Sequence, residues 1–238
     1  IVSLVPLLLH LNHPALPGDV EDAPAGIADF ILSNYQQNFL SKEHPELVED
    51  VQSAVNSDAV FAPILGIYVM GSFGSISQTS ASDLDIWICH QDDLSEQDQQ
   101  RLAEKTKKIS LWASTFHVEM HFYLMTQKRF RNERYSDPLT KENSGSAQYM
   151  LLLEEFYRSA VRLSGKPLLW LHLWVEDEKQ YEAEVARLVM EGELNPNDWV
   201  DFGGLGQFSA SEYFGASLWQ LYKGIDSPYK SVMKILLL

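Results

Sequence analysis

Apolar residues along the middle of the chain recur with the spacing of strands and of helices in turn. Ser95 and Asp98 form a pair that commonly opens a helix, and helical spacing follows this pair and returns over about 146–163. The order strand, loop, strand, helix, strand, helix, strand predicts a mixed sheet with helices packed beside it. The apolar runs that are typical of strands cover 64–70, 83–90, 118–125 and 166–175.

The two flanks of the chain are dominated by helical spacing. Over 26–41 apolar residues recur every three or four positions, whereas 14–25 is rich in proline and acidic residues and predicts a loop. We therefore expect an α+β fold with a mostly helical N-terminal segment, a mixed core and a C-terminal helical lobe that continues past the last residue. These parts are expected over 1–56, 57–175 and 176–238, with the helices of the lobe near 176–191, 209–223 and 227–238.

The composition is that of a folded, acidic protein. Of the 238 residues, 45% are hydrophobic and 21% are charged, which supplies enough apolar material for a core. The formal net charge of −15 argues against a nucleic-acid partner, because phosphate backbones are bound by basic surfaces. No apolar run reaches the ~18 residues that a membrane helix needs, so membrane insertion is not expected. The single cysteine, Cys89, cannot form an internal disulfide, which favours a reducing, cytoplasmic location.

Charge is distributed unevenly along this acidic chain. Residues 1–60 hold nine acids and one base, and residues 171–201 hold nine acids and two bases. Residues 126–166 reverse the balance, with eight bases against five acids. A local excess of positive charge attracts anions, so we expect an anionic ligand near this segment.

Two aspartates open the second predicted strand. Because the side chains of a strand alternate between its faces, Asp83 and Asp85 are expected on one face, roughly 6–7 Å apart along the strand. Two neighbouring carboxylates repel each other unless a cation lies between them. Such oxygen ligands suit Mg²⁺, which takes its other ligands from water and substrate phosphates. The alternative is an edge strand with two solvated acids, which a bare Asp-X-Asp pattern does not exclude.

Two further features follow from the predicted fold. Gly71 and Ser72 come directly after the first strand, where a glycine backbone and a hydroxyl can approach phosphate oxygens; an ordinary turn is the alternative. Glu119 lies between apolar neighbours in the third predicted strand. It would join Asp83 and Asp85 if that strand pairs beside them, and a surface glutamate is the alternative.

The order of these residues resembles the nucleotidyltransferase superfamily of DNA polymerase β. The shared pattern is Gly-Ser, ten residues, Asp-X-Asp, and a later acid with apolar neighbours. More narrowly, the chain resembles the N-terminal catalytic region of class I adenylate cyclases of the enterobacterial type. The resemblance covers most of the chain, is weakest over 19–60, and is carried by the runs at 82–90, 151–158, 212–223 and 226–230.

This resemblance implies a nucleotidyltransferase-like palm that converts ATP to 3′,5′-cyclic AMP and pyrophosphate. It implies two Mg²⁺ ions, with Mn²⁺ as an alternative, held by Asp83, Asp85 and Glu119. The ribose 3′-hydroxyl of ATP would attack the α-phosphorus in line. Ser72 and the backbone at Gly71 would hold the β- and γ-phosphates, and no covalent enzyme intermediate is implied.

Basic and polar residues elsewhere are candidates for binding the triphosphate. Arg129 and Arg131 follow the third predicted strand, and Arg158 lies on a predicted helix where pairing with two neighbouring glutamates is the alternative. Lys223 lies near the end of a predicted helix, where a favourable interaction with the helix dipole is the alternative. The resemblance implies phosphate contacts from the helical lobe, for which the candidates are Lys223, Ser227 and Tyr229.

Two other functions share parts of this pattern. A transferase that moves a nucleotidyl group onto a small molecule or protein would use the same acids. A catalytically silent nucleotidyltransferase-like interaction module would keep the fold without the chemistry, and the complete set of Asp83, Asp85 and Glu119 argues against it. The resemblance also implies regulatory contact with a sugar-phosphotransferase-system protein, through a region outside this chain.

Overall fold

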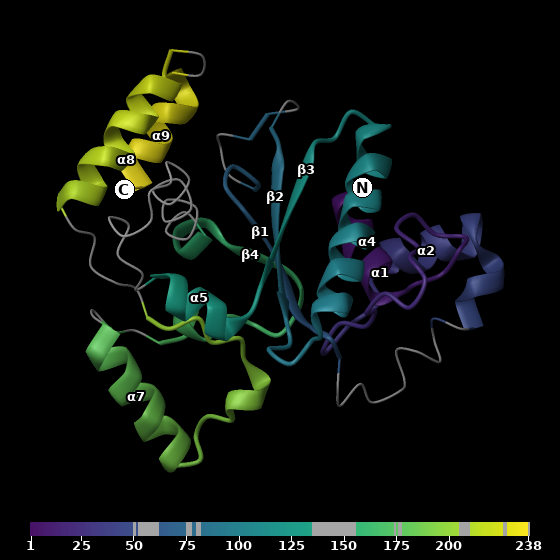
Figure 1. The fold of residues 1–238 in the computed structure, drawn as a ribbon, viewed down its shortest axis with the longest axis horizontal. Helices are drawn as coiled ribbons and strands as arrows, with labels where there is room; N and C mark the ends of the chain where they lie inside the picture. The colour runs from purple at the N-terminus through teal and green to yellow at the C-terminus, as the bar shows by residue number, and fades with distance from the viewer. Residues whose placement is uncertain are drawn as a thin grey trace.

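A mixed four-stranded sheet forms the centre of the computed structural model (Figure 1). Its strands are β1 (Ile64–Met70), β2 (Leu84–His90), β3 (Met120–Met125) and β4 (Val161–Gly165). They are ordered β3-β2-β1-β4, with β2 parallel to β3 and β1 antiparallel to both of its neighbours. The structure describes residues 1–49, 51, 62–74, 78–79, 82–134, 156–173, 175, 178–204, 210–225 and 228–237.

Helices and single helical turns flank this sheet. Figure 1 shows α1, α2 and α4 on one side of it and α5 on the other. The α-helices are α1 (Val5–His10), α2 (Asn34–Glu43), α4 (Glu96–Ser114), α5 (Gln127–Arg134), α7 (Glu178–Met190), α8 (Ala210–Lys223) and α9 (Pro228–Leu237). The 3-10 turns are η1 (Val2–Leu4), η2 (Pro45–Leu47), η4 (Leu169–Leu171) and η5 (Pro196–Asp198).

The two central strands, β1 and β2, are buried on both faces of the sheet, which explains their near-continuous apolar runs. On one face, Ile86 and Ile88 pack with apolar residues of α1 and α4. On the other face, Trp87 and Cys89 pack with an aromatic cluster that includes Phe130. Because the side chains of β2 alternate between two buried layers, its only polar positions are at its ends.

The expected helix behind Ser95 is confirmed as α4. The Ser95 hydroxyl accepts a hydrogen bond from the Asp98 backbone N–H at 3.1 Å, which satisfies one of the free donors at the helix start. Within α4 the Lys105 side chain is buried, and its ammonium group donates to the Leu11 and Gly18 carbonyls at 2.8 and 3.4 Å. These bonds attach the proline-rich N-terminal loop to α4.

Two boundaries differ from the sequence predictions because of tertiary contacts. The helix expected over 26–41 begins only at Asn34, since Ser33 caps it and Ile27 forms a parallel bridge with Ile64. The strand expected over 166–175 is wrong. The fourth strand is β4, which ends at Gly165 with a φ of 83° and is followed by η4.

Other boundaries shift by less. The third strand begins at Met120, so Glu119 precedes β3 rather than lying within it. The helix expected over 146–163 lies largely outside the described residues; residues 156–159 are helical, and its predicted end is occupied by β4. The three helices expected near the C-terminus are confirmed as α7, α8 and α9. The division of the chain into three parts stays a prediction. In the described part of the chain, no helix is both long and apolar enough to span a bilayer.

His10 connects the N-terminal segment to the start of β1. Its ring stacks on Phe30 with centroids 3.9 Å apart, and its Nδ1 accepts a hydrogen bond from the Ile27 N–H at 3.1 Å. Ile27 in turn pairs with Ile64. Burial lowers the pKa of His10 to about 4, because the imidazolium form loses its hydration.

We predict that His10 makes the protein less stable in mild acid. The unfolded chain binds this proton near pH 6.5 and the folded chain only near pH 4, so stability falls as the pH drops through this window. His10→Asn keeps a hydrogen-bond acceptor and does not titrate. The stability advantage of the wild type over this variant should shrink by about 2–3 kcal/mol between pH 7 and pH 4 in urea unfolding. A constant difference would contradict the prediction.

Candidate functional site

One edge of the sheet collects most of the residues singled out from the sequence. Because β1 is antiparallel to β2 and β4, its end lies beside their beginnings; Met70 pairs with Asp85, and Val69 pairs with Val161. The parallel pairing of β2 with β3 brings the start of β3 to the same edge. The candidates at this edge, which we call the strand-end site, are Gly71, Ser72, Asp83, Asp85, Glu119 and Arg158.

The backbone places Asp83 and Glu119 side by side just before β2 and β3, with Asp85 two residues further along. Leu84 pairs with Met120, and the Leu84 N–H donates to the Glu119 carbonyl at 2.9 Å. Asp83 and Glu119 are therefore the residues just before this pair, on one face of the sheet with Asp85. The condition set from the sequence is met, because the strand that Glu119 precedes pairs beside the aspartates.

The side chains of Glu119 and Asp85 contact other residues. Glu119 is 74% exposed, and its Oε1 lies 3.1 Å from Nε2 of His121. Asp85 Oδ1 accepts a hydrogen bond from the Tyr123 hydroxyl at 3.3 Å. Among the residues that the structure describes, no group of three or more His, Cys, Asp and Glu side chains is arranged to hold a metal ion. The backbone alone therefore brings the three acids to the same edge of the sheet. Joint ligation of a metal ion by their side chains stays a prediction.

The Gly71–Ser72 turn is held by a residue that the sequence did not single out. Gly71 has a φ of 86°, which favours glycine, and its N–H donates to the Ser159 hydroxyl at 2.9 Å. The Gly74 N–H donates to the Gln78 side chain at 2.8 Å. Two amide groups near this turn thus have partners within the protein. Ser72 is only 5% exposed, so its hydroxyl lies below the surface of the turn.

The candidate arginines divide between the two ends of the sheet. Arg158 is exposed and precedes Ser159, which contacts the Gly71 turn, so Arg158 belongs to the strand-end site. Arg129 and Arg131 lie in α5, which follows the opposite end of β3. Six strand residues extend about 20 Å, so the backbone of α5 begins far from Glu119.

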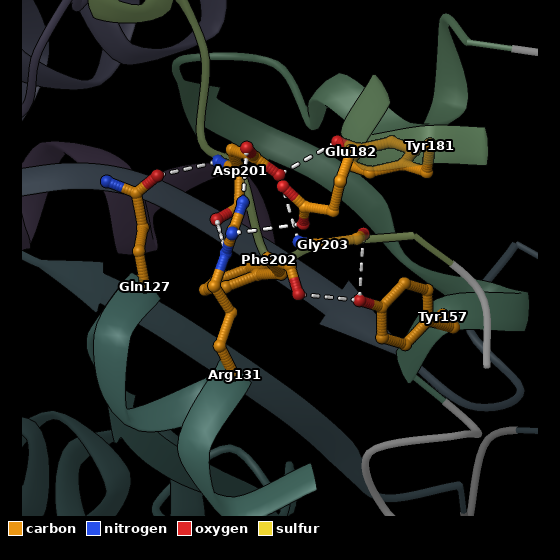
Figure 2. Close-up of polar contacts among 8 residues, drawn as sticks. All are labelled: Gln127, Arg131, Tyr157, Tyr181, Glu182, Asp201, Phe202 and Gly203. Carbon is orange, nitrogen blue, oxygen red and sulfur yellow. Dashed lines mark hydrogen bonds and ion pairs between the residues drawn. The ribbon is translucent and has the colours of Figure 1, made fainter. Parts of the chain in front are cut away.

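Arg131 is part of a polar cluster around Asp201 (Figure 2). Its guanidinium forms ion pairs with Asp201 and, at 3.2 Å, with Glu182. The Asp201 Oδ1 also accepts hydrogen bonds from the Tyr181 hydroxyl at 2.8 Å and the Gly203 N–H at 2.9 Å. Burial and the Asp201 carboxylate raise the pKa of Tyr181 well above its usual value, so its hydroxyl remains a donor.

Three further hydrogen bonds belong to this cluster, which we call the Asp201 clamp. The Asp201 N–H donates to the Gln127 side chain at 2.7 Å, and the Tyr157 hydroxyl donates to the carbonyls of Phe202 and Gly203 at 2.8 and 3.0 Å. These bonds attach residues 201–203 to α5 and to the core (Figure 2). The contacts of Arg131 therefore support a structural role.

The remaining candidates lie in or between the last two helices, α8 and α9, which pack against each other. Lys223 is exposed in the last turn of α8, with its ammonium 5.5 Å from the centre of the Trp219 ring. Tyr229 is exposed on α9. Ser227 lies outside the described residues. Phosphate contacts from these three residues stay predictions.

Comparison with known proteins identifies the family. Residues 1–171 match the family model of the adenylate cyclase NT domain, and residues 208–238 match that of the class-I adenylate cyclase second domain. The chain belongs to the class-I adenylate cyclase family. The resemblance to class I adenylate cyclases stated from the sequence is confirmed.

Curated bacterial relatives align with the full length of this chain. The adenylate cyclases of Haemophilus influenzae, Pasteurella multocida and Yersinia intermedia are 70%, 62% and 48% identical to it over its full length. The chain spans only 28–29% of these relatives. A crystal structure of a toxin-antitoxin with AMP-PNP aligns with 55% of this chain and 76% of its own at 16% identity, with a TM-score of 0.25 that supports no conclusion.

We predict that the Asp201 clamp needs the forked guanidinium of Arg131. Arg131→Lys keeps the charge but cannot contact Asp201 and Glu182 together, so the free energy of unfolding should fall by about 2 kcal/mol. Arg187→Lys is the matched control, because Arg187 pairs with Glu184 and Glu191 on the exposed face of α7. The control should show no measurable change in chemical denaturation. Equal effects of both variants would contradict the clamp.

Proposed function

We propose that this chain is the catalytic part of an adenylate cyclase that converts ATP to 3′,5′-cyclic AMP and pyrophosphate. Membership of the class-I family supports the proposal. The observation that carries it is the adjacent placement of Asp83, Asp85 and Glu119 beside the Gly71–Ser72 turn. The same arrangement supports a nucleotidyltransferase-like palm, with α8 and α9 in a C-terminal helical lobe.

The chemistry of the three acids fits divalent cations. Carboxylate oxygens are the protein ligands that Mg²⁺ and Mn²⁺ prefer, and Asp83 and Asp85 are partly exposed at the edge of the sheet. Two such ions, when bound with ATP, would lower the pKa of the ribose 3′-hydroxyl and stabilise the charge on the attacking and leaving oxygens. A protein with a net charge of −15 can bind ATP more readily when cations neutralise the triphosphate.

Each residue of the strand-end site then has a distinct task. Asp83 and Asp85 would hold the cations at the start of β2. The exposed Glu119 carboxylate would join them when its side chain rotates away from His121. The turn at Gly71 and Ser72, held by Ser159, receives the β- and γ-phosphates. Together these contacts orient the 3′-hydroxyl toward the α-phosphorus, so that attack and departure of pyrophosphate are in line.

Arg158 is the candidate cation on the protein side. It is exposed at the same edge, next to the residue that holds the Gly71 turn. Its guanidinium can donate two parallel hydrogen bonds to phosphate oxygens. Additional phosphate contacts from Lys223, Ser227 and Tyr229 are part of the proposal, as is regulation by a sugar-phosphotransferase-system protein through residues beyond this chain.

We predict that Asp83→Asn and Asp85→Asn each lower the rate of cyclic AMP formation by roughly a hundredfold or more, because the amide keeps the shape but loses the charge. Asp93→Asn is the matched control, since Asp93 is an exposed aspartate beyond the opposite end of β2. It should keep wild-type activity. Near-normal activity of Asp83→Asn or Asp85→Asn would exclude the site.

The products of the same assay separate the candidate functions. Incubation of the intact protein with Mg²⁺ and labelled ATP should give cyclic AMP and pyrophosphate in equal amounts. Label that stays on a small molecule or protein would instead identify a nucleotidyl transferase. If neither cyclic AMP nor a labelled acceptor forms, and calorimetry detects no binding of Mg²⁺-ATP, the protein is a silent module and the proposal is overturned.

We predict that Arg158→Gln weakens ATP binding. Loss of one charged contact to phosphate should raise the KM for ATP about tenfold, with a smaller effect on kcat. Arg101→Gln is the control, because Arg101 lies on α4 and pairs with Asp22 and Asp98. Steady-state kinetics should show an unchanged KM for the control, and an unchanged KM for Arg158→Gln would remove Arg158 from the site.

A further inference from the structure

Tyr123 joins the strand-end site to the aromatic core. Its hydroxyl donates to Asp85 Oδ1 at 3.3 Å. Its ring stacks on Trp87, with ring centres 5.4 Å apart and planes inclined by 27°. Trp87 is 1% exposed and stacks in turn on Phe156 at 4.8 Å. Stacking on the buried Trp87 ring therefore restricts the movement of the Tyr123 ring.

The register of the sheet explains how the hydroxyl reaches Asp85. Tyr123 pairs with Trp87 across the parallel strands, and Asp85 pairs with His121. Asp85 is thus the diagonal neighbour of Tyr123 on the same face, a separation that a long aromatic side chain can span. A slip of the register would remove the contact and the stacking together.

We infer that Tyr123 is a positioning residue that fixes the orientation of the Asp85 carboxylate for a divalent cation. This inference rests on the proposed function. A neutral hydroxyl bonds one oxygen of the carboxylate without neutralising its negative charge, which an arginine at the same place would do. Partners of this kind set the orientation of metal-binding side chains and influence their affinity.

The neighbouring pair of His121 and Glu119 is a weaker candidate for a positioning role than Tyr123. His121 lies two residues earlier on the same face and contacts Glu119. Both of these side chains are largely exposed, at 47% and 74%, and nothing stacks on them in the described contacts. Tyr123 is partly buried against Trp87, so its hydroxyl has less freedom to move.

The test is the variant Tyr123→Phe, which keeps the stacking and removes the hydroxyl. Binding of Mn²⁺ alone to the intact protein, measured by the loss of its free EPR signal, should weaken about tenfold. Cyclic AMP formation should need a correspondingly higher Mg²⁺ concentration and should approach the wild-type kcat at saturating Mg²⁺.

Tyr68→Phe is the matched control. Tyr68 is a buried tyrosine of β1 whose hydroxyl donates to the Lys166 carbonyl at 2.7 Å, beyond the far end of β4. This variant also loses one hydrogen bond from a tyrosine hydroxyl, and its Mn²⁺ affinity should equal that of the wild type. Equal weakening in both variants would show a general structural effect and overturn the positioning role.

Two further outcomes separate this inference from the proposed function. If Asp85→Asn loses Mn²⁺ while Tyr123→Phe binds it as the wild type does, the metal site stands and the inference about Tyr123 is wrong. If the wild type itself binds no Mn²⁺ that Asp83→Asn or Asp85→Asn removes, the proposed metal site is wrong, and the inference is wrong with it.

Discussion

The parallel pairing of β2 with β3 is the constraint on which the strand-end site depends. It aligns Asp85 with His121 and brings Glu119 beside Asp83. A shift by one residue would turn every side chain of β3 to the opposite face. The buried layers prevent that shift, because Phe122 of β3 packs against one apolar layer and Met125 belongs to the other. The chemistry at the edge is therefore positioned by packing in the core.

Local patterns predicted the parts of the fold that local chemistry decides. The apolar run of β1 and the cap at Ser95 were found because each signal lies within a few residues. The strand expected over 166–175 was wrong because the signal for β4 lies in its pairing with β1, which no local pattern contains. The helix expected from residue 26 was shortened for the same reason, since Ile27 pairs with Ile64.

The basic segment 126–166 shows how much of a residue's role the charge pattern of the sequence can predict. The excess of bases over 126–166 indicated an anionic ligand, and Arg158 precedes Ser159, whose hydroxyl contacts the Gly71 turn. Arg131, in the same segment, instead pairs with Glu182 and Asp201 of the acidic segment 171–201. The contacts that distinguish these roles join residues far apart in the chain, as the bond between Gly71 and Ser159 does. Spacing along the sequence cannot reveal them.

The Asp201 clamp also has a consequence for how the molecule opens. It ties α5, α7 and residues 201–203 together on one face of the sheet, whereas α1 and α4 cover the other face. If each layer detaches as a cooperative unit, detachment of either would expose one side of β1 and β2 to solvent. Amide protons of these two strands should accordingly be the slowest to exchange with deuterium, since their release requires both layers to separate.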